Sequence, residues 1–430
     1  MADPAARRIA FYVRATSRVD TQTASSFYLI RPVMGMLELA KVDAGAVSIQ
    51  WARGWCAERT YVTGQFNASE DPVIGYLWEG TRRWQGTDIN SPSLESLTTQ
   101  AQPTFSDMSQ PESLTDFVRY AFPSAASGED FLVLFGHGGP PTIGLWMREL
   151  SLSDRDALAA VGQTSGARIL GVTIGVPNTQ PPTPAAPMTL LGVGEGLRKA
   201  VRLNGRKLTA LVSCQCFMAT IESLYEYRTV CDFLLASQPL LPVPVWPHDV
   251  LVRAVLDTKQ PPKTALQQFM KYFETHLQSR SKNSTISLTD MDDVATFFTC
   301  FGRFVDCCAN ADSQLLFPAI LAVGEKHAGD IVIDSKLGLV DFRKFLEHLA
   351  VELPADQTPA LRTVIDELLN WIKQSITVTH GDRDLSGLSA VLPLPNFATA
   401  SNILDAYSAS CSLGHDFPAW VALLEKLNAT

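Results

Sequence analysis

Short runs of apolar and β-branched residues alternate with stretches of helical periodicity in the first half of the chain, and this alternation most constrains the fold. The β-type runs lie at residues 9–13, 47–51, 61–66, 131–135, 208–213 and 233–236. Helical spacing occurs between them at residues 27–42, 114–122 and 190–203. The pattern predicts an α/β fold in which helices cover both faces of one sheet.

From about residue 249 the pattern becomes mostly helical. Helical spacing covers residues 264–277, 289–305, 314–323, 342–351 and 359–372, and one β-type run follows at 387–392. With 430 residues, 46% of them hydrophobic, the chain can build one large core or two medium ones. We therefore expect an α/β domain at 1–250 and a mostly helical domain at 251–430.

Charge and apolar patterning bear on the compartment and the partners. The 35 basic and 44 acidic residues give a net charge of -9, which argues against a nucleic-acid partner. The apolar run at 9–13 is shorter than the roughly 7 to 15 residues of an export signal, and the apolar stretch at 233–256 is interrupted by prolines and charges. We expect a cytoplasmic protein that does not contact membranes, with its eight cysteines present as thiols.

A histidine follows the apolar run at 131–135. The chain continues directly into Gly136, His137, Gly138 and Gly139. Open α/β sheets place their sites at the carboxyl ends of strands, and glycines let the backbone approach a substrate closely. His137 is therefore a candidate site residue; the alternative is a loop histidine with a capping role.

A cysteine follows the run at 208–213 in the same way. Cys216 should lie on a strand-to-helix turn, with a helix beginning around Phe217 whose first amides favour the thiolate. A nucleophilic cysteine fits this position. The alternative is a core cysteine, because free cysteines are often buried.

Together the two segments resemble the clostripain family of cysteine peptidases, which has a caspase-like fold. The family's histidine motif, a hydrophobic strand followed by His-Gly, matches Phe131 to Gly139. Its cysteine motif, Asp-Ala-Cys-Leu-Met-Ala followed by Glu, matches Cys214 to Ala219 with Glu222. Further similar segments lie at 108–117, 189–200, 285–290 and 387–393, the third resembling a helix start. The resemblance implies a caspase-like α/β/α sandwich with a mostly helical C-terminal domain.

The resemblance also implies a mechanism. Cys216 would be the nucleophile and His137 its acid and base, and the backbone N–H groups of Gly138 and Cys216 would hold the oxyanion. This chemistry requires no metal and no cofactor. The spacing of Cys214 and Cys216, and of Cys307 and Cys308, does not match structural zinc sites, in which paired cysteines are two to four residues apart.

One departure affects the substrate pocket. The family has an aspartate two residues before the nucleophile, which helps to bind a basic P1 side chain, and this chain has Cys214 there. Asp249 is a candidate for the missing carboxylate; alternatively it is the N-cap of the next helix. We expect Cys214 and Asp249 to line the pocket and Arg or Lys to be preferred at P1.

The segment between the two motifs is expected to control activation. In the family, a cut after a basic residue in this region frees the cleft, and Arg148, Arg155 and Arg168 lie here, before a proline-rich run at 177–187. We therefore expect a zymogen that acts on protein or peptide substrates and responds to an activating protease or an inhibitory partner, as in a stress or defence cascade. The alternative is a catalytically silent caspase-like module that binds or regulates a partner protease. Retention of His137, Gly138 and Cys216 together favours the enzyme.

Overall fold

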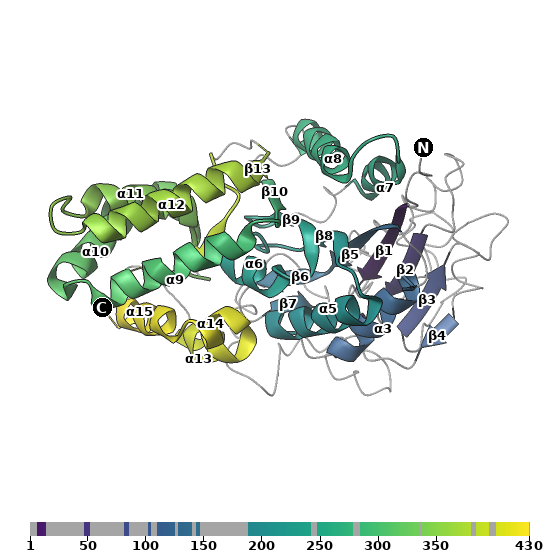
Figure 1. Cartoon of the computed structure of the whole chain (residues 1–430), viewed down its shortest axis with the longest axis horizontal. Helices are drawn as coiled ribbons and strands as arrows, with labels where there is room; N and C mark the ends of the chain where they lie inside the picture. Colours follow the sequence, from purple (N-terminus) through teal and green to yellow (C-terminus); the bar gives the residue numbers. More distant parts are fainter. Residues whose placement is uncertain are drawn as a thin grey trace, which may run out of the picture.

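One mixed sheet with helices on both faces dominates the computed structural model (Figure 1). The structure describes residues 7–13, 47–51, 81–85, 102–104, 110–124, 128–139, 143–146, 188–241, 247–277, 284–335, 337–379, 384–394 and 401–429. Nine described strands form the sheet in the order β13-β10-β9-β8-β5-β1-β2-β3-β4. They are β1 (Arg7–Val13), β2 (Val47–Trp51), β3 (Thr81–Gln85), β4 (Gln102–Thr104), β5 (Glu129–Phe135), β8 (Leu208–Cys214), β9 (Cys231–Ser237), β10 (Ile286–Asp290) and β13 (Ile376–Val378).

The centre of the sheet is parallel. Strands β2, β1, β5, β8 and β9 run in one direction, and the strands outside them pair antiparallel. Almost every described side chain in β5 and β8 is buried, as expected for parallel strands covered on both faces. This explains why both segments read as continuous apolar runs in the sequence.

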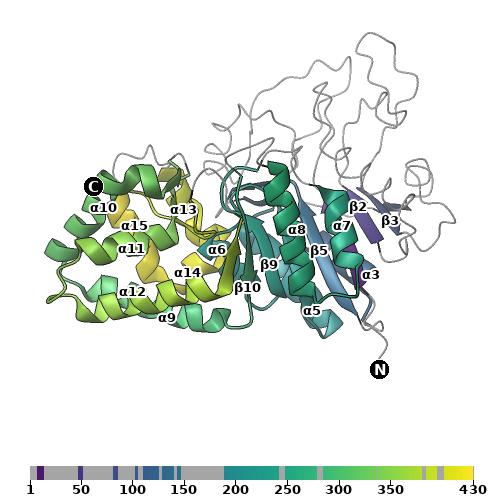
Figure 2. The same cartoon turned by 90° about the horizontal axis from the view of Figure 1, so that it is seen from above.

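Helices cover the two faces in pairs. Helices α3 (Pro111–Ala121) and α5 (Leu190–Asn204) lie on one face, and α7 (His248–Leu256) and α8 (Pro262–Leu277) lie on the other (Figures 1 and 2). Gly196 permits the close packing of α5 on α3, because a Cβ there would lie 2.7 Å from the carbonyl oxygen of Pro111. Gly196 therefore serves the packing of α5 on α3.

The other described helices lie at the β13 end of the sheet (Figure 1). They are α6 (Ile221–Tyr227), α9 (Val294–Asn310), α10 (Ser313–Ile331), α11 (Phe342–Glu352), α12 (Pro359–Ser375), α13 (Ser401–Ser410), α14 (Ser412–Asp416) and α15 (Pro418–Asn428). Strands β11 (Val332–Asp334), β12 (Leu339–Asp341) and β14 (Ser389–Val391) form a small sheet among them. In the described part of the chain no single helix meets the length and hydropathy required to cross a membrane; α9 and α10 do so only as a pair bent by 117°.

The α/β/α sandwich with many C-terminal helices is confirmed. One prediction was wrong: residues 289 and 290 end strand β10 rather than beginning a helix, and α9 starts at Val294. The expected strand at 61–66 and helix at 27–42 lie outside the described residues. The boundary near residue 250 stays a prediction, although β10, β13 and the α7–α8 pair from beyond it belong to the sheet or cover it.

A buried histidine on α7 makes stability depend on pH. His248 is 1% exposed and lies edge-on to the rings of Phe11 and Phe135, with ring centroids 6.2 and 5.4 Å away. Burial lowers the pKa of His248 to about 3. The native side chain therefore stays neutral while the unfolded chain takes up a proton below about pH 6.5.

Because the unfolded state then binds more protons, the free energy of unfolding falls as the pH is lowered. We expect His248 to contribute a loss of about 2 kcal/mol between pH 6.5 and 5. The measurement is urea unfolding at both pH values for the wild type and His248→Leu, with the exposed His415→Gln as control. An equal pH dependence of the wild type and His248→Leu would contradict the assignment.

Candidate active site

The two motifs end side by side at the carboxyl edge of the sheet. Strands β5 and β8 are parallel neighbours, and their last residues, Phe135 and Cys214, are register partners. His137 and Cys216 each follow two residues later. His137 begins strand β6 (His137–Gly139), which pairs with β7 (Ile143–Trp146). Both predicted catalytic residues therefore leave the sheet at the same place.

Gly138 brings the two segments into direct contact. A Cβ on Gly138 would lie 2.7 Å from the carbonyl oxygen of Cys216, 2.8 Å from the Met218 sulfur and 2.9 Å from the Gln215 Cβ. Such distances are shorter than side chains allow, so the backbone beside His137 can approach the cysteine turn only with glycine at this position. The side chain of His137 itself is not among those that the structure describes.

The Cys216 thiol is buried, with 5% of the residue exposed. Its Sγ accepts the N–H of Leu241 at 3.3 Å and lies 3.6 Å from the carbonyl oxygen of the same residue, to which it donates as a thiol. The backbone of Leu241 therefore holds the sulfur from both its amide and its carbonyl. Leu241 follows β9 in a proline-rich segment, and the local sequence carries no signal for this contact.

The turn that carries Cys216 differs from the expected one. Helix α6 begins at Ile221 with Thr220 as its N-cap, so the prediction that helix amides adjoin Cys216 was wrong. Instead Phe217 adopts a positive φ of 60°, a conformation that is strained for a bulky side chain and often found at functional sites. Its N–H donates to the Pro239 carbonyl, and the Ala219 N–H donates to the Ser237 carbonyl.

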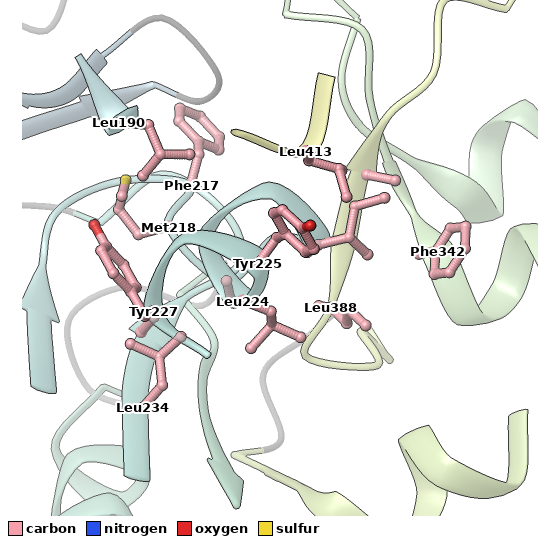
Figure 3. Packing of buried hydrophobic residues seen from close by; sticks show 14 of the residues in the cluster. Leu190, Phe217, Met218, Leu224, Tyr225, Tyr227, Leu234, Phe342, Leu388 and Leu413 are labelled. Carbon is pink, nitrogen blue, oxygen red and sulfur yellow. The ribbon is translucent and has the colours of Figure 1, made fainter. Parts of the chain in front are cut away.

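Buried side chains anchor this turn. Phe217 and Met218 lie next to Leu190 at the start of α5, and all three are at most 2% exposed (Figure 3). The turn is therefore fixed by α5 on one side and by the end of β9 on the other.

The two residues predicted to line the substrate pocket, Cys214 and Asp249, lie in different surroundings. Cys214 is 2% exposed, and burial raises the pKa of its thiol well above the usual value, so it is neutral at physiological pH. Asp249 lies in the first turn of α7, and its side chain is outside the described part. Its alternative role as the N-cap was wrong, because Pro247 occupies that position. The predicted activation sites Arg148, Arg155 and Arg168 lie outside the described residues.

The described residues form no metal site. Among them no group of three His, Cys, Asp or Glu side chains is arranged to hold a metal ion. The seven cysteines described are all free thiols. At this edge of the sheet a thiol lies beside a strand that carries a histidine.

A family match that spans the thiol supports the class of cysteine peptidases. Residues 188–326, which include Cys216, match the model of the clostripain family. This match confirms the predicted resemblance to that family. No curated protein matches the chain.

Solved structures support the fold along nearly the whole chain. One is a secreted C11 cysteine protease from Bacteroides thetaiotaomicron, "iotapain", with a TM-score of 0.59, 12% identity, and coverage of 98% of this chain and 100% of that one. Another is an inactive zymogen C11 protease from Parabacteroides distasonis, with a TM-score of 0.54, 12% identity and coverage of 97% and 99%. A third is a secreted C11 cysteine protease from B. thetaiotaomicron in complex with an irreversible peptide inhibitor. Its TM-score is 0.52 at 11% identity, and the match covers 98% of this chain and 99% of that one. At these identities the likeness establishes the fold alone.

Proposed function

We propose that the chain is a cysteine endopeptidase of clostripain type that uses His137 and Cys216 as its catalytic dyad. The observation that carries the proposal is the contact of Gly138 with the carbonyl of Cys216, which joins the histidine strand to the cysteine turn. The register of β5 and β8 supports it, because both residues follow paired strand ends. A silent module has no need for a histidine, a glycine and a thiol in this arrangement.

The proposed mechanism uses these two residues. His137 takes the proton of the Cys216 thiol as the sulfur attacks the scissile carbonyl carbon, and it passes this proton to the departing amine when the C–N bond breaks and the thioester forms. His137 then takes a proton from water, which hydrolyses the thioester and restores the thiol. The N–H groups of Gly138 and Cys216 hold the oxyanion, a type of contact worth about 2.7 to 4 kcal/mol. None of these steps requires a metal or a cofactor.

The proposed preference is for Arg or Lys at P1. Its support is the family resemblance, and it requires a carboxylate, since a desolvated cation needs a paired charge. The neutral Cys214 cannot supply that charge. Asp249, in the first turn of α7, remains the proposed source.

The proposal includes latency. The Cys216 thiol is buried and bonded to Leu241, so a substrate can reach the sulfur only after local movement. The P. distasonis relative is an inactive zymogen. We propose that a cut after Arg148, Arg155 or Arg168, made by an activating protease, or release of an inhibitory partner, frees the site. The proposed setting is the cytoplasm, in a regulated stress or defence cascade.

One experiment tests activity, specificity and latency together. Purified protein is incubated with a panel of fluorogenic peptides that differ at P1, with and without trypsin as a trial activator, while intact masses are recorded. We expect the hydrolysis of Arg and Lys peptides to rise at least about tenfold as two associated chains replace the single one, because the cut frees the cleft. The activator is inhibited before the peptides are added.

The control is Cys216→Ala, which should be cut by the activator and remain inactive. Full activity of an uncut single chain would contradict latency. A preference for acidic or apolar P1 residues would contradict the proposed pocket carboxylate, and absence of hydrolysis from both forms would contradict the peptidase.

A further inference from the structure

A buried carboxylate on the first turn of α6 lies close behind the cysteine turn. Glu222 is 0% exposed, and its Oε1 accepts the Val391 N–H at 3.1 Å and the Tyr407 hydroxyl at 2.7 Å. The Tyr407 hydroxyl accepts the Trp420 indole N–H at 3.2 Å. Oε2 is also buried, and within the described part of the chain it has no hydrogen-bond partner. Burying a carboxylate against neutral donors is costly, so its presence calls for an explanation.

The hydrogen bonds of Glu222 join α6 to β14 and α13, two elements far away in the sequence. Strand β14 also contacts the cysteine turn directly. The Ser389 N–H donates to the Ala219 carbonyl at 2.8 Å, and Ser389 forms a parallel bridge with Thr220. Strand β14 is thus attached at its first residue to the end of the turn and at its last residue to Glu222.

The segment that leads into β14 is held separately. Gln238, which follows β9, accepts the Gly387 N–H at 2.7 Å and donates to the Leu388 carbonyl at 3.1 Å. Ala219 therefore lies between two fixed strands, because its N–H bonds to β9 and its carbonyl bonds to β14. Among the described hydrogen bonds, the one from the Val391 N–H to Glu222 secures the far end of β14 to the helix that follows Cys216.

We propose that Glu222 is a positioning residue for Cys216, which fastens β14 and α13 to α6 and thereby fixes the turn that carries the nucleophile. The proposal rests on the assignment of Cys216 as the nucleophile. It makes the C-terminal segment from β14 to α15 part of the scaffold of the active site. Burial raises the pKa of Glu222, and hydrogen bonds from Tyr407, its own backbone amide, Val391 and Thr220 oppose this.

The same helix offers a matched control. Glu226 is also 0% exposed and lies one turn further along α6. Its carboxylate pairs with Arg198 at 2.7 Å and accepts the Ser412 N–H, and no described contact joins it to β14. Removal of either carboxylate should destabilise the protein, whereas only removal of Glu222 should disturb the cysteine turn.

The test compares Glu222→Leu, Glu226→Leu and the conservative Glu222→Gln in the full chain. Amide hydrogen exchange is measured for peptides covering 216–220 and 389–391, together with kcat and KM of the activated protein. We expect Glu222→Leu to exchange at least about tenfold faster in both peptides and to lose at least about tenfold in kcat with KM within about twofold. Glu226→Leu should keep the hydrogen exchange and the kcat of the wild type. Glu222→Gln retains the acceptor oxygen and should therefore also show values close to those of the wild type.

The proposal would be overturned if Glu222→Leu kept the hydrogen exchange and the kcat of the wild type. It would also be overturned if Glu226→Leu changed both quantities as much as Glu222→Leu does. If Glu222→Leu does not fold, the test uses Tyr407→Phe, which removes only the hydroxyl that donates to Glu222. Unchanged hydrogen exchange at 389–391 in Tyr407→Phe would also overturn the proposal. Hydrogen exchange does not require activity. If the wild type hydrolyses no peptide, the proposed function fails while the exchange data still decide the role of Glu222.

Discussion

Replacement of Cys216 or His137 by alanine should abolish peptide hydrolysis and leave the fold intact. Without the sulfur no thioester can form, and without the imidazole the departing amine receives no proton. Because the two side chains act as a unit, we expect each single variant to lose at least about a thousandfold in kcat/KM and the double variant to lose little more. Peptide hydrolysis is measured after activation, with thermal unfolding as the check on folding.

Cys214→Ala is the matched control for these variants. Burial keeps the Cys214 thiol protonated, so it is a poor nucleophile, and its removal should leave kcat/KM within about threefold. An electrophilic peptide label should modify Cys216 and not Cys214, as determined by mass spectrometry of digests. Modification of Cys214 instead would show that the nucleophile had been assigned to the wrong cysteine.

The sequence was sufficient to predict the centre of the sheet because that region is covered on both faces. Strands β5 and β8 are mostly apolar, and their ends were predicted within a few residues. Strand β10 was missed for the opposite reason. Its buried polar side chains, Ser287 and Thr289, alternate with apolar ones, and the aromatic residues that follow in α9 made the whole segment read as helical.

The candidate site was predictable only where its residues follow strand ends. His137 and Cys216 could be identified because a strand leads into each of them. The contact of Leu241 with the sulfur and the bonds from Glu222 to Val391 and Tyr407 join residues 25 to 185 positions apart. No local pattern encodes such contacts. The positive φ of Phe217 was equally hidden, because bulky residues rarely adopt this conformation.

Gly138→Ala should reduce activity strongly, although alanine keeps the N–H that is proposed to hold the oxyanion. The new methyl group would meet the backbone oxygen of Cys216 at 2.7 Å and the Gln215 Cβ at 2.9 Å, and neither can turn away as a flexible side chain would. The histidine strand and the cysteine turn must therefore move apart. A misplacement of about 1 Å costs on the order of a hundredfold in rate, so we expect a loss of that size in kcat/KM.

Gly196→Ala separates this effect from general overpacking. Its methyl group would also lie 2.7 Å from a backbone oxygen, that of Pro111 in the α3–α5 contact, away from the cysteine turn. Both variants should lose about 1 to 3 kcal/mol in the free energy of unfolding, as overpacked sites do. Only Gly138→Ala should also lose activity when rates are normalised to folded protein. A folded Gly138→Ala with the kcat/KM of the wild type would show that the approach of the two segments serves packing and not catalysis.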